Sequence, residues 1–128
     1  MYTVIETPTF LADCETAGIS EEERAAMVAA ISREPSAGEM IVGTGGARKR
    51  RFGRRGKGKS GGYRTVSYFA GEDVPVLLLA LIDKGERADL SQAERNELRK
   101  ELAAYARDYR TSVRKRVATI GLRAGGRS

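Results

Sequence analysis

The sequence lacks histidine altogether, and it contains a single cysteine, Cys14, among its 128 residues. Histidine is the commonest general base and the commonest metal ligand in proteins, so imidazole-based catalysis is excluded. One thiol permits no internal disulfide and, without histidine, it argues against a zinc site. Any catalysis must therefore use lysine, arginine, tyrosine, serine or carboxylate groups, and we expect no metal and no other cofactor.

Long apolar runs are also missing. No run reaches the ~20 residues that a membrane-spanning helix needs. The opening segment, MYTVIETPTF, has neither the basic start nor the apolar stretch of a signal peptide. We therefore expect a cytoplasmic protein. The length and the 41% of hydrophobic residues suit one globular domain, which we place at residues 1–118, followed by a flexible tail at 119–128.

The net charge of +6 is distributed unevenly along the chain. Residues 1–47 carry 2 basic and 8 acidic side chains, and residues 65–101 carry 5 basic and 8 acidic ones. In contrast, residues 48–64 carry 9 basic and no acidic side chains, and residues 102–128 carry 7 and 1. Crowded cations repel one another, so two such patches indicate a polyanion-binding role, and we expect a nucleic acid. The alternative is a solvated charged face with a basic tail.

The N-terminal third reads as a strand followed by two helices. The β-rich run at 2–6 predicts the strand, and Pro8 suits the first turn of a short helix. Ser20 and Glu23 form a capping box for a second helix, which should stop before Pro35. Two helices so close together in the sequence predict a helical hairpin.

Three further strands are predicted at 47–52, 63–69 and 74–82. The third of these runs is apolar on both faces, which is typical of a central, buried strand. In the first two, side chains alternate between the faces of the sheet. The groups that should share a face are Lys49 with Arg51, Arg48 with Arg50 and Phe52, Arg64 with Val66 and Tyr68, and Thr65 with Ser67 and Phe69.

A long helix should complete the chain. Ser91 and Glu94 form a second capping box. Apolar residues then recur at spacings of three and four, which indicates a core-facing stripe; the stripe consists of Leu98, Leu102, Tyr105, Tyr109, Val113 and Val117. The helix is long for a small domain, so its far end should project or bind a partner. We therefore predict an α+β fold with a small antiparallel β-sheet of about four strands, flanked by the N-terminal helical hairpin and the long C-terminal helix.

The segment GRRGKGKS, residues 53–60, fits the phosphate-loop pattern G-x-x-x-x-G-K-S. A phosphate loop functions by joining a strand to a helix, whose N-terminus then holds the phosphates. Here Ser60 is followed by two glycines and a β-rich run, and Asp83 ends a buried strand where such an enzyme would bind magnesium. We therefore interpret the segment as a hairpin between two strands and reject a nucleotidase.

The predicted hairpin suits single-stranded RNA. Arg64, Val66 and Tyr68 would present a cation, an apolar floor and an aromatic ring on one face. Repulsion within the cationic loop favours loss of a proton, so Lys57 or Lys59 could act as base or acid. The alternative is that these lysines only bind phosphate.

Over about residues 1–105 the sequence resembles the HigB branch of the RelE/ParE superfamily, toxins of bacterial type II toxin–antitoxin systems. The matching motifs, in order, are EP-x-x-G (34–38), GTGGARK (43–49), GKGKSGGYR (56–64), YF (68–69) and DLS (89–91). The resemblance implies a small antiparallel sheet flanked by helices. It also implies a toxin that cuts messenger RNA on the ribosome without histidine, and a cognate helix-turn-helix antitoxin as partner.

The residue roles that follow from the resemblance are expectations. Lys57, Lys59 and Arg64 match the basic catalytic motif of the family. Other residues should contact RNA; these are Arg48, Lys49, Arg50, Arg51, Arg54, Arg55, Tyr68, Lys84 and Arg87. Two alternatives stay open: a ParE-like gyrase inhibitor that cuts nothing, and a non-catalytic RNA-binding module.

Overall fold

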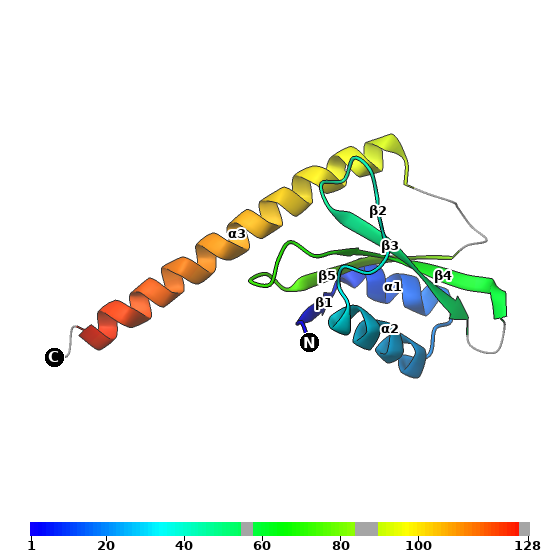
Figure 1. Cartoon of the computed structure of the whole chain (residues 1–128), viewed down its shortest axis with the longest axis horizontal. Helices are drawn as coiled ribbons and strands as arrows, with labels where there is room; N and C mark the ends of the chain where they lie inside the picture. The colour runs from blue at the N-terminus through cyan, green and yellow to red at the C-terminus, as the bar shows by residue number, and fades with distance from the viewer. Residues whose placement is uncertain (55–57, 84–89, 126–128) are drawn as a thin grey trace.

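The protein is described by a computed structural model that covers residues 1–54, 58–83 and 90–125, with side chains described at 1–53, 62–83 and 90–120. Two helices cover one face of a β-sheet, and a long third helix crosses the other face (Figure 1). The elements in chain order are β1 (Val4–Glu6), α1 (Pro8–Thr16), α2 (Glu21–Arg33), β2 (Glu39–Met40), β3 (Ala47–Arg54), β4 (Gly58–Tyr68), β5 (Val76–Asp83) and α3 (Gln92–Gly125).

The helix starts follow from local side-chain chemistry. The Thr7 hydroxyl accepts a hydrogen bond from the Phe10 amide and so caps α1. Ser20 and Glu23 make both bonds of the predicted capping box at the start of α2. At the start of α3, the Glu94 amide donates to the Ser91 hydroxyl and Glu94 accepts from the Ser91 amide, so the second predicted box is confirmed.

The sheet has five strands in the order β1-β5-β4-β3-β2. This exceeds the expected four or so, because the short β2 pairs with β3 through Glu39 opposite Lys49. The β1–β5 pair is parallel, with Val4 opposite Val76, whereas every other pair is antiparallel. The sheet is therefore mixed, but the predicted α+β fold class is confirmed.

Two cores lie on opposite faces of the sheet. On one face, Phe10 of α1 and Ile31 of α2 pack over β5 with almost no exposed surface. On the other face, Leu102 of α3 packs over Val66 of β4 and Ile82 of β5. The predicted alternation along β4 is confirmed, because Val66 and Tyr68 belong to the core beneath α3, whereas Tyr63 and Phe69 pack in the core beneath α1 and α2.

Helix α3 is anchored to the sheet only along its first half. The Tyr105 hydroxyl donates to the Pro75 carbonyl at 2.9 Å, and burial raises the pKa of Tyr105. Beyond Arg110 the helix projects away from the sheet (Figure 1). The expectation of a continuous core stripe is therefore wrong at Val113 and Val117, which are 43% and 62% exposed.

The helix also continues to Gly125, through part of the segment 119–128 that was expected to be a flexible tail. Although α3 is long, it is strongly charged. Among the described residues, no helix combines the length and the apolar character that crossing a membrane requires.

Candidate functional site

The phosphate-loop pattern lies in a β-hairpin, as predicted. Strands β3 and β4 pair from Ala47 and Tyr68 at one end to Arg54 and Gly58 at the other. The strands are longer than expected, since β4 already includes Gly58, which the sequence placed in the loop. No helix follows Ser60, so the geometry of a nucleotide-binding loop is absent from this described segment.

Cations gather on the α3 side of the sheet beside the hairpin. Arg51 and Arg64 are directly opposite each other on β3 and β4, and Lys49 follows two residues away on the same face. Side chains directly opposite each other across a strand pair have Cβ atoms about 5 Å apart. Arg51 and Arg64 therefore place two positive charges on the same part of this face, and a phosphate bound there would be attracted by both.

A depression of about 320 Å³ lies beside these cations, and its lining residues are Gly38, Glu39, Lys49, Arg50, Arg51 and Arg64. Gly38 has φ 105°, and a Cβ at this position would lie 2.5 Å from the Lys49 carbonyl oxygen. Only glycine therefore permits the chain to pass so close to β3. We call the group of Lys49, Arg51 and Arg64 around this depression the cationic face.

Glu39 is a member of this site that the sequence did not reveal. It is exposed on β2, directly opposite Lys49, and therefore lies on the cationic face. A two-residue strand within a glycine-rich loop leaves no periodic signal, so only the pairing with β3 shows where Glu39 lies. It is the one carboxylate that lines the described part of the depression.

Arg50 lies on the opposite side of β3, together with Arg48. Its Nη1 donates to the carbonyl oxygens of Ala30 at 3.3 Å and Glu34 at 3.5 Å, and its guanidinium lies 5.1 Å from the centre of the Phe52 ring. Carbonyls at a helix C-terminus attract cations. Arg50 thus joins α2 to the sheet, and we leave Arg48 and Arg50 out of the proposed RNA surface.

Tyr68 shares a face with Arg64 but is covered by α3. Its side chain is 8% exposed, and its ring packs edge-on against Tyr105 with 6.4 Å between the ring centres. A Cβ added to Gly46 would lie 3.2 Å from the same ring. Tyr68 therefore belongs to the core, and the expectation that it stacks on an RNA base is not retained.

Several expected site residues lie outside the described part. Arg55 and Lys57, and also Lys84 and Arg87, lie outside the described residues altogether. Arg54 and Lys59 lie in β3 and β4, but their side chains are outside the described set. Of the three expected catalytic residues, Arg64 is thus the one that the structure places.

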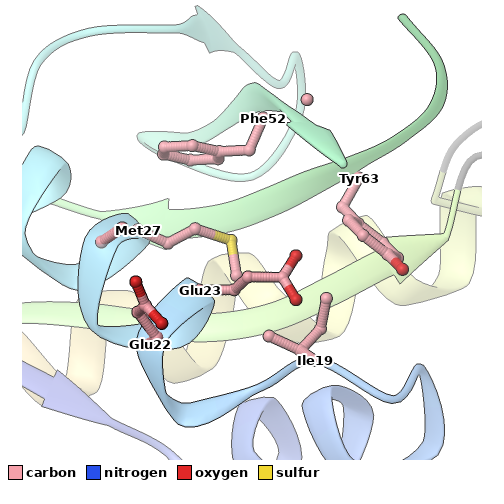
Figure 2. A pocket seen from close by; sticks show the side chains of 8 residues that line it. Ile19, Glu22, Glu23, Met27, Phe52 and Tyr63 are labelled. Carbon is pink, nitrogen blue, oxygen red and sulfur yellow. The ribbon is translucent and has the colours of Figure 1, made fainter. Parts of the chain in front are cut away.

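A second hollow, of about 350 Å³, lies on the other face of the sheet near the same end of β3 and β4. Figure 2 shows the apolar side chains of Met27, Phe52 and Tyr63 around it, with Glu22 and Glu23 projecting from α2. Carboxylates repel phosphate, so this hollow is unsuited to RNA. The acidic groups of α2 therefore distinguish this hollow from the cationic face, which is the candidate site.

Neither a metal site nor a reactive thiol is found in the described part of the chain. Among the described residues, no three acidic, cysteine or histidine side chains come together in a way that could hold a metal ion. Cys14 is buried, and burial raises its pKa to about 11, so it is protonated and unreactive near neutral pH.

Comparison with known families adds an independent result. A sequence profile described as the RelE toxin of the RelE/RelB toxin–antitoxin system matches residues 7–123. The match continues beyond residue 105, where the resemblance seen in the motifs ended, and it includes most of α3. The HigB branch is not distinguished by this match and stays a prediction. Because the profile covers nearly the whole chain, the protein belongs to the RelE toxin family of toxin–antitoxin systems.

Proposed function

We propose that the protein is a toxin that blocks translation by cleaving messenger RNA on the ribosome. The observation that carries this proposal is the cationic face, where Lys49, Arg51 and Arg64 line one depression on the hairpin. The hairpin connects this face to Lys57 and Lys59, which match the family's basic catalytic motif. Family membership supports a toxin that acts with a cognate antitoxin.

The proposed reaction is an internal transfer at an RNA phosphate. The 2′-oxygen attacks the neighbouring phosphorus, and the bond from phosphorus to the 5′-oxygen breaks. A base takes the proton of the 2′-hydroxyl, and an acid protonates the leaving 5′-oxygen. The products are a 2′,3′-cyclic phosphate and a 5′-hydroxyl, so no metal, water or redox partner is needed in this step.

The cations act on the charge that develops during this reaction. The pentacoordinate intermediate carries more negative charge than the bound phosphate, so a preorganised cation lowers the barrier, typically by about 3 kcal/mol for each donor. We assign this role to Arg64, which lies on a regular strand opposite Arg51. Lys57 and Lys59 would act as base and acid, and Lys49 and Arg51 would hold the adjacent phosphates.

Single-turnover cleavage of a message on programmed ribosomes tests this proposal. We expect Arg64→Ala to reduce the cleavage rate about 100-fold or more, as the loss of one such donor commonly does. Arg48→Ala is the matched control, because it removes the same charge from the other face of β3. Thermal melting checks that both variants fold.

Two results would contradict the proposal. If Arg64→Ala cleaves at the wild-type rate, the cationic face is not the active site. If the wild-type protein leaves messages intact but inhibits purified DNA gyrase, the alternative of a gyrase inhibitor applies.

A further inference from the structure

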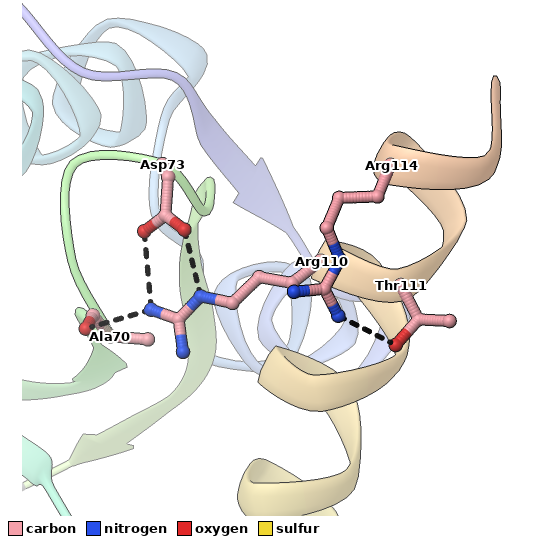
Figure 3. Close-up of polar contacts among 5 residues, drawn as sticks. All are labelled: Ala70, Asp73, Arg110, Thr111 and Arg114. Carbon is pink, nitrogen blue, oxygen red and sulfur yellow. Dashed lines mark hydrogen bonds and ion pairs between the residues drawn. The ribbon is translucent and has the colours of Figure 1, made fainter. Parts of the chain in front are cut away.

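An ion pair joins the middle of α3 to the turn that precedes β5. Arg110 Nε donates to Asp73 Oδ2 at 2.8 Å, and Arg110 Nη2 donates to Asp73 Oδ1 at 3.1 Å (Figure 3). The same Nη2 also donates to the Ala70 carbonyl at 3.4 Å. A two-pronged pair of this kind restrains direction as well as distance. The helix beyond Arg110 is thus presented in a defined orientation.

The projecting segment carries an apolar stripe that the fold leaves exposed. Val113, Val117 and Ile120 are 43%, 62% and 59% exposed. Their spacing of four and three places them within an arc of about 60° on the helix, in line with Leu102 and Ala106, which pack on the sheet. The stripe that anchors α3 therefore continues past the sheet, and no segment in the described part of the chain covers it.

Arginines line both sides of this stripe. At 3.6 residues per turn, Arg110 and Arg114 lie on one flank and Arg116 lies on the other, whereas Lys115 lies about 160° away from Val113 on the far side. Arg114 donates to the Thr111 hydroxyl at 3.5 Å, which also holds it alongside the helix. An apolar stripe with cations on each flank is the arrangement by which paired helices select oppositely charged partners.

We propose that residues 110–120 of α3 form a docking surface for a segment of a partner protein, and that this segment folds as an amphipathic helix with an apolar ridge between acidic flanks. The ridge would cover Val113, Val117 and Ile120, and the acidic groups would pair with Arg114 and Arg116. Figure 1 places this segment at the opposite end of the molecule from the β3–β4 hairpin. The proposal is therefore independent of the proposed nuclease site.

Charge argues for this occupant over the alternatives. A second copy of the chain would bring arginines against arginines, because Asp108 is the sole acidic residue after position 101. A nucleic acid would satisfy the arginines but leave the apolar stripe in water. An acidic amphipathic helix satisfies both features at once.

Binding of a designed peptide to the full-length protein tests the proposal. The probe is a fluorescently labelled helical peptide of about three heptads, with leucine or isoleucine at the ridge and glutamate at the flanking positions. A second peptide carries lysine in place of each glutamate. We expect micromolar binding of the first peptide in fluorescence anisotropy and at least about tenfold weaker binding of the second.

Neighbouring charge reversals provide the matched variants. Arg116→Glu changes the charge beside the stripe, and Lys115→Glu makes the same change on the far side. We expect Arg116→Glu to weaken binding about tenfold or more and Lys115→Glu to weaken it less than about threefold. Val117→Ser should also weaken it, whereas Arg64→Ala should bind like the wild type. Circular dichroism confirms that each variant keeps α3.

Four outcomes would overturn the proposal. If Arg116→Glu and Lys115→Glu weaken peptide binding equally, the peptide is attracted by the net charge of the helix and not by the stripe with its flanking arginines. A single-stranded RNA of about 12 nucleotides that binds α3 more tightly than the acidic peptide would make it a nucleic-acid surface. Binding to anionic vesicles that depends on Val117, without peptide binding, would make it a membrane surface. A concentration-dependent dimer that Val117→Ser disrupts would make it a contact between copies.

Discussion

The two basic regions of this protein have similar charge but opposite settings. In the cationic face, Arg51 and Arg64 lie on paired strands beside a depression lined mostly by strand residues. In the projecting part of α3, the arginines line an exposed apolar stripe on a helix that nothing else in the described chain covers. The first setting suits a compact anion, and the second suits an extended partner with its own apolar surface. The structural surroundings of the basic residues, more than how many of them a region has, therefore indicate what that region binds.

The largest difference expected from this comparison is in stability along α3 itself. Leu102 is 2% exposed in the core, so Leu102→Ala should lower the free energy of unfolding by about 2–5 kcal/mol. Val117 is 62% exposed, so Val117→Ala should change it by about 0.5 kcal/mol at most. Urea denaturation measures both. A large loss with Val117→Ala would show that the projecting segment packs against the domain in solution.

Substitutions of two adjacent arginines on β3 should have different effects, one on stability and the other on RNA binding. Arg50 bonds to the end of α2, so Arg50→Ala should reduce the free energy of unfolding by about 1 kcal/mol. Arg51 is exposed on the cationic face, so Arg51→Ala should leave stability unchanged and weaken RNA binding. On a log–log plot of affinity against salt, we expect Arg51→Ala to reduce the slope by about 0.7, the value for one phosphate of a single strand. The same slope for both variants would place RNA on both faces of the sheet.

A smaller effect is expected at Glu39, the carboxylate within the cationic face. Removing its charge in Glu39→Gln should strengthen RNA binding about two- to fivefold, because a repulsive charge beside the phosphates disappears. Gel-shift titration measures the affinity, and single-turnover kinetics measures the cleavage rate. If affinity is unchanged and cleavage falls 100-fold, Glu39 is the base instead.

The smallest effect is a pH dependence confined to α3. The hydrogen bond from Arg110 holds the pKa of Asp73 below its usual range. The contribution of this pair is therefore present above the carboxyl's unfolded pKa and is lost as pH falls through the lowered folded value. Spin-label distances between residue 117 and the sheet should broaden at acid pH, and in Asp73→Asn already at pH 7. Strands β3 and β4 are held together by backbone pairing along their length, so distances across them should not broaden over the same range. Equal broadening in both places would point to general acid unfolding.

Local chemistry predicted much of the fold from the sequence. Capping boxes, the helix stop before Pro35 and the alternation of side chains along β3 and β4 are determined by neighbouring residues, so they could be recognised. Phosphate-binding candidates on β3 and β4 followed from the same alternation.

What could not be predicted depends on contacts between distant segments. Tyr68 seemed available because nothing in the sequence says that α3 covers it, and Arg50 seemed equivalent to Arg51 because its partners on α2 lie 16 and 20 residues away. Strand β2 exists only through its pairing with β3. The cationic face thus consists of the basic residues that tertiary packing leaves together on one face of the sheet.

The parallel pairing of β1 with β5 has a consequence for how the chain folds. Hairpin β3–β4 can close as soon as its own residues are made, but Val4 must wait for Val76, and α3 docks later still. Closing so long a loop costs more conformational entropy than closing a hairpin, and it slows folding. During synthesis the cationic hairpin should therefore form well before the sheet edge and the covering helix that complete the domain. A newly made chain therefore passes through an interval in which its basic strands β3 and β4 are paired but β1 and α3 have not yet docked on the sheet.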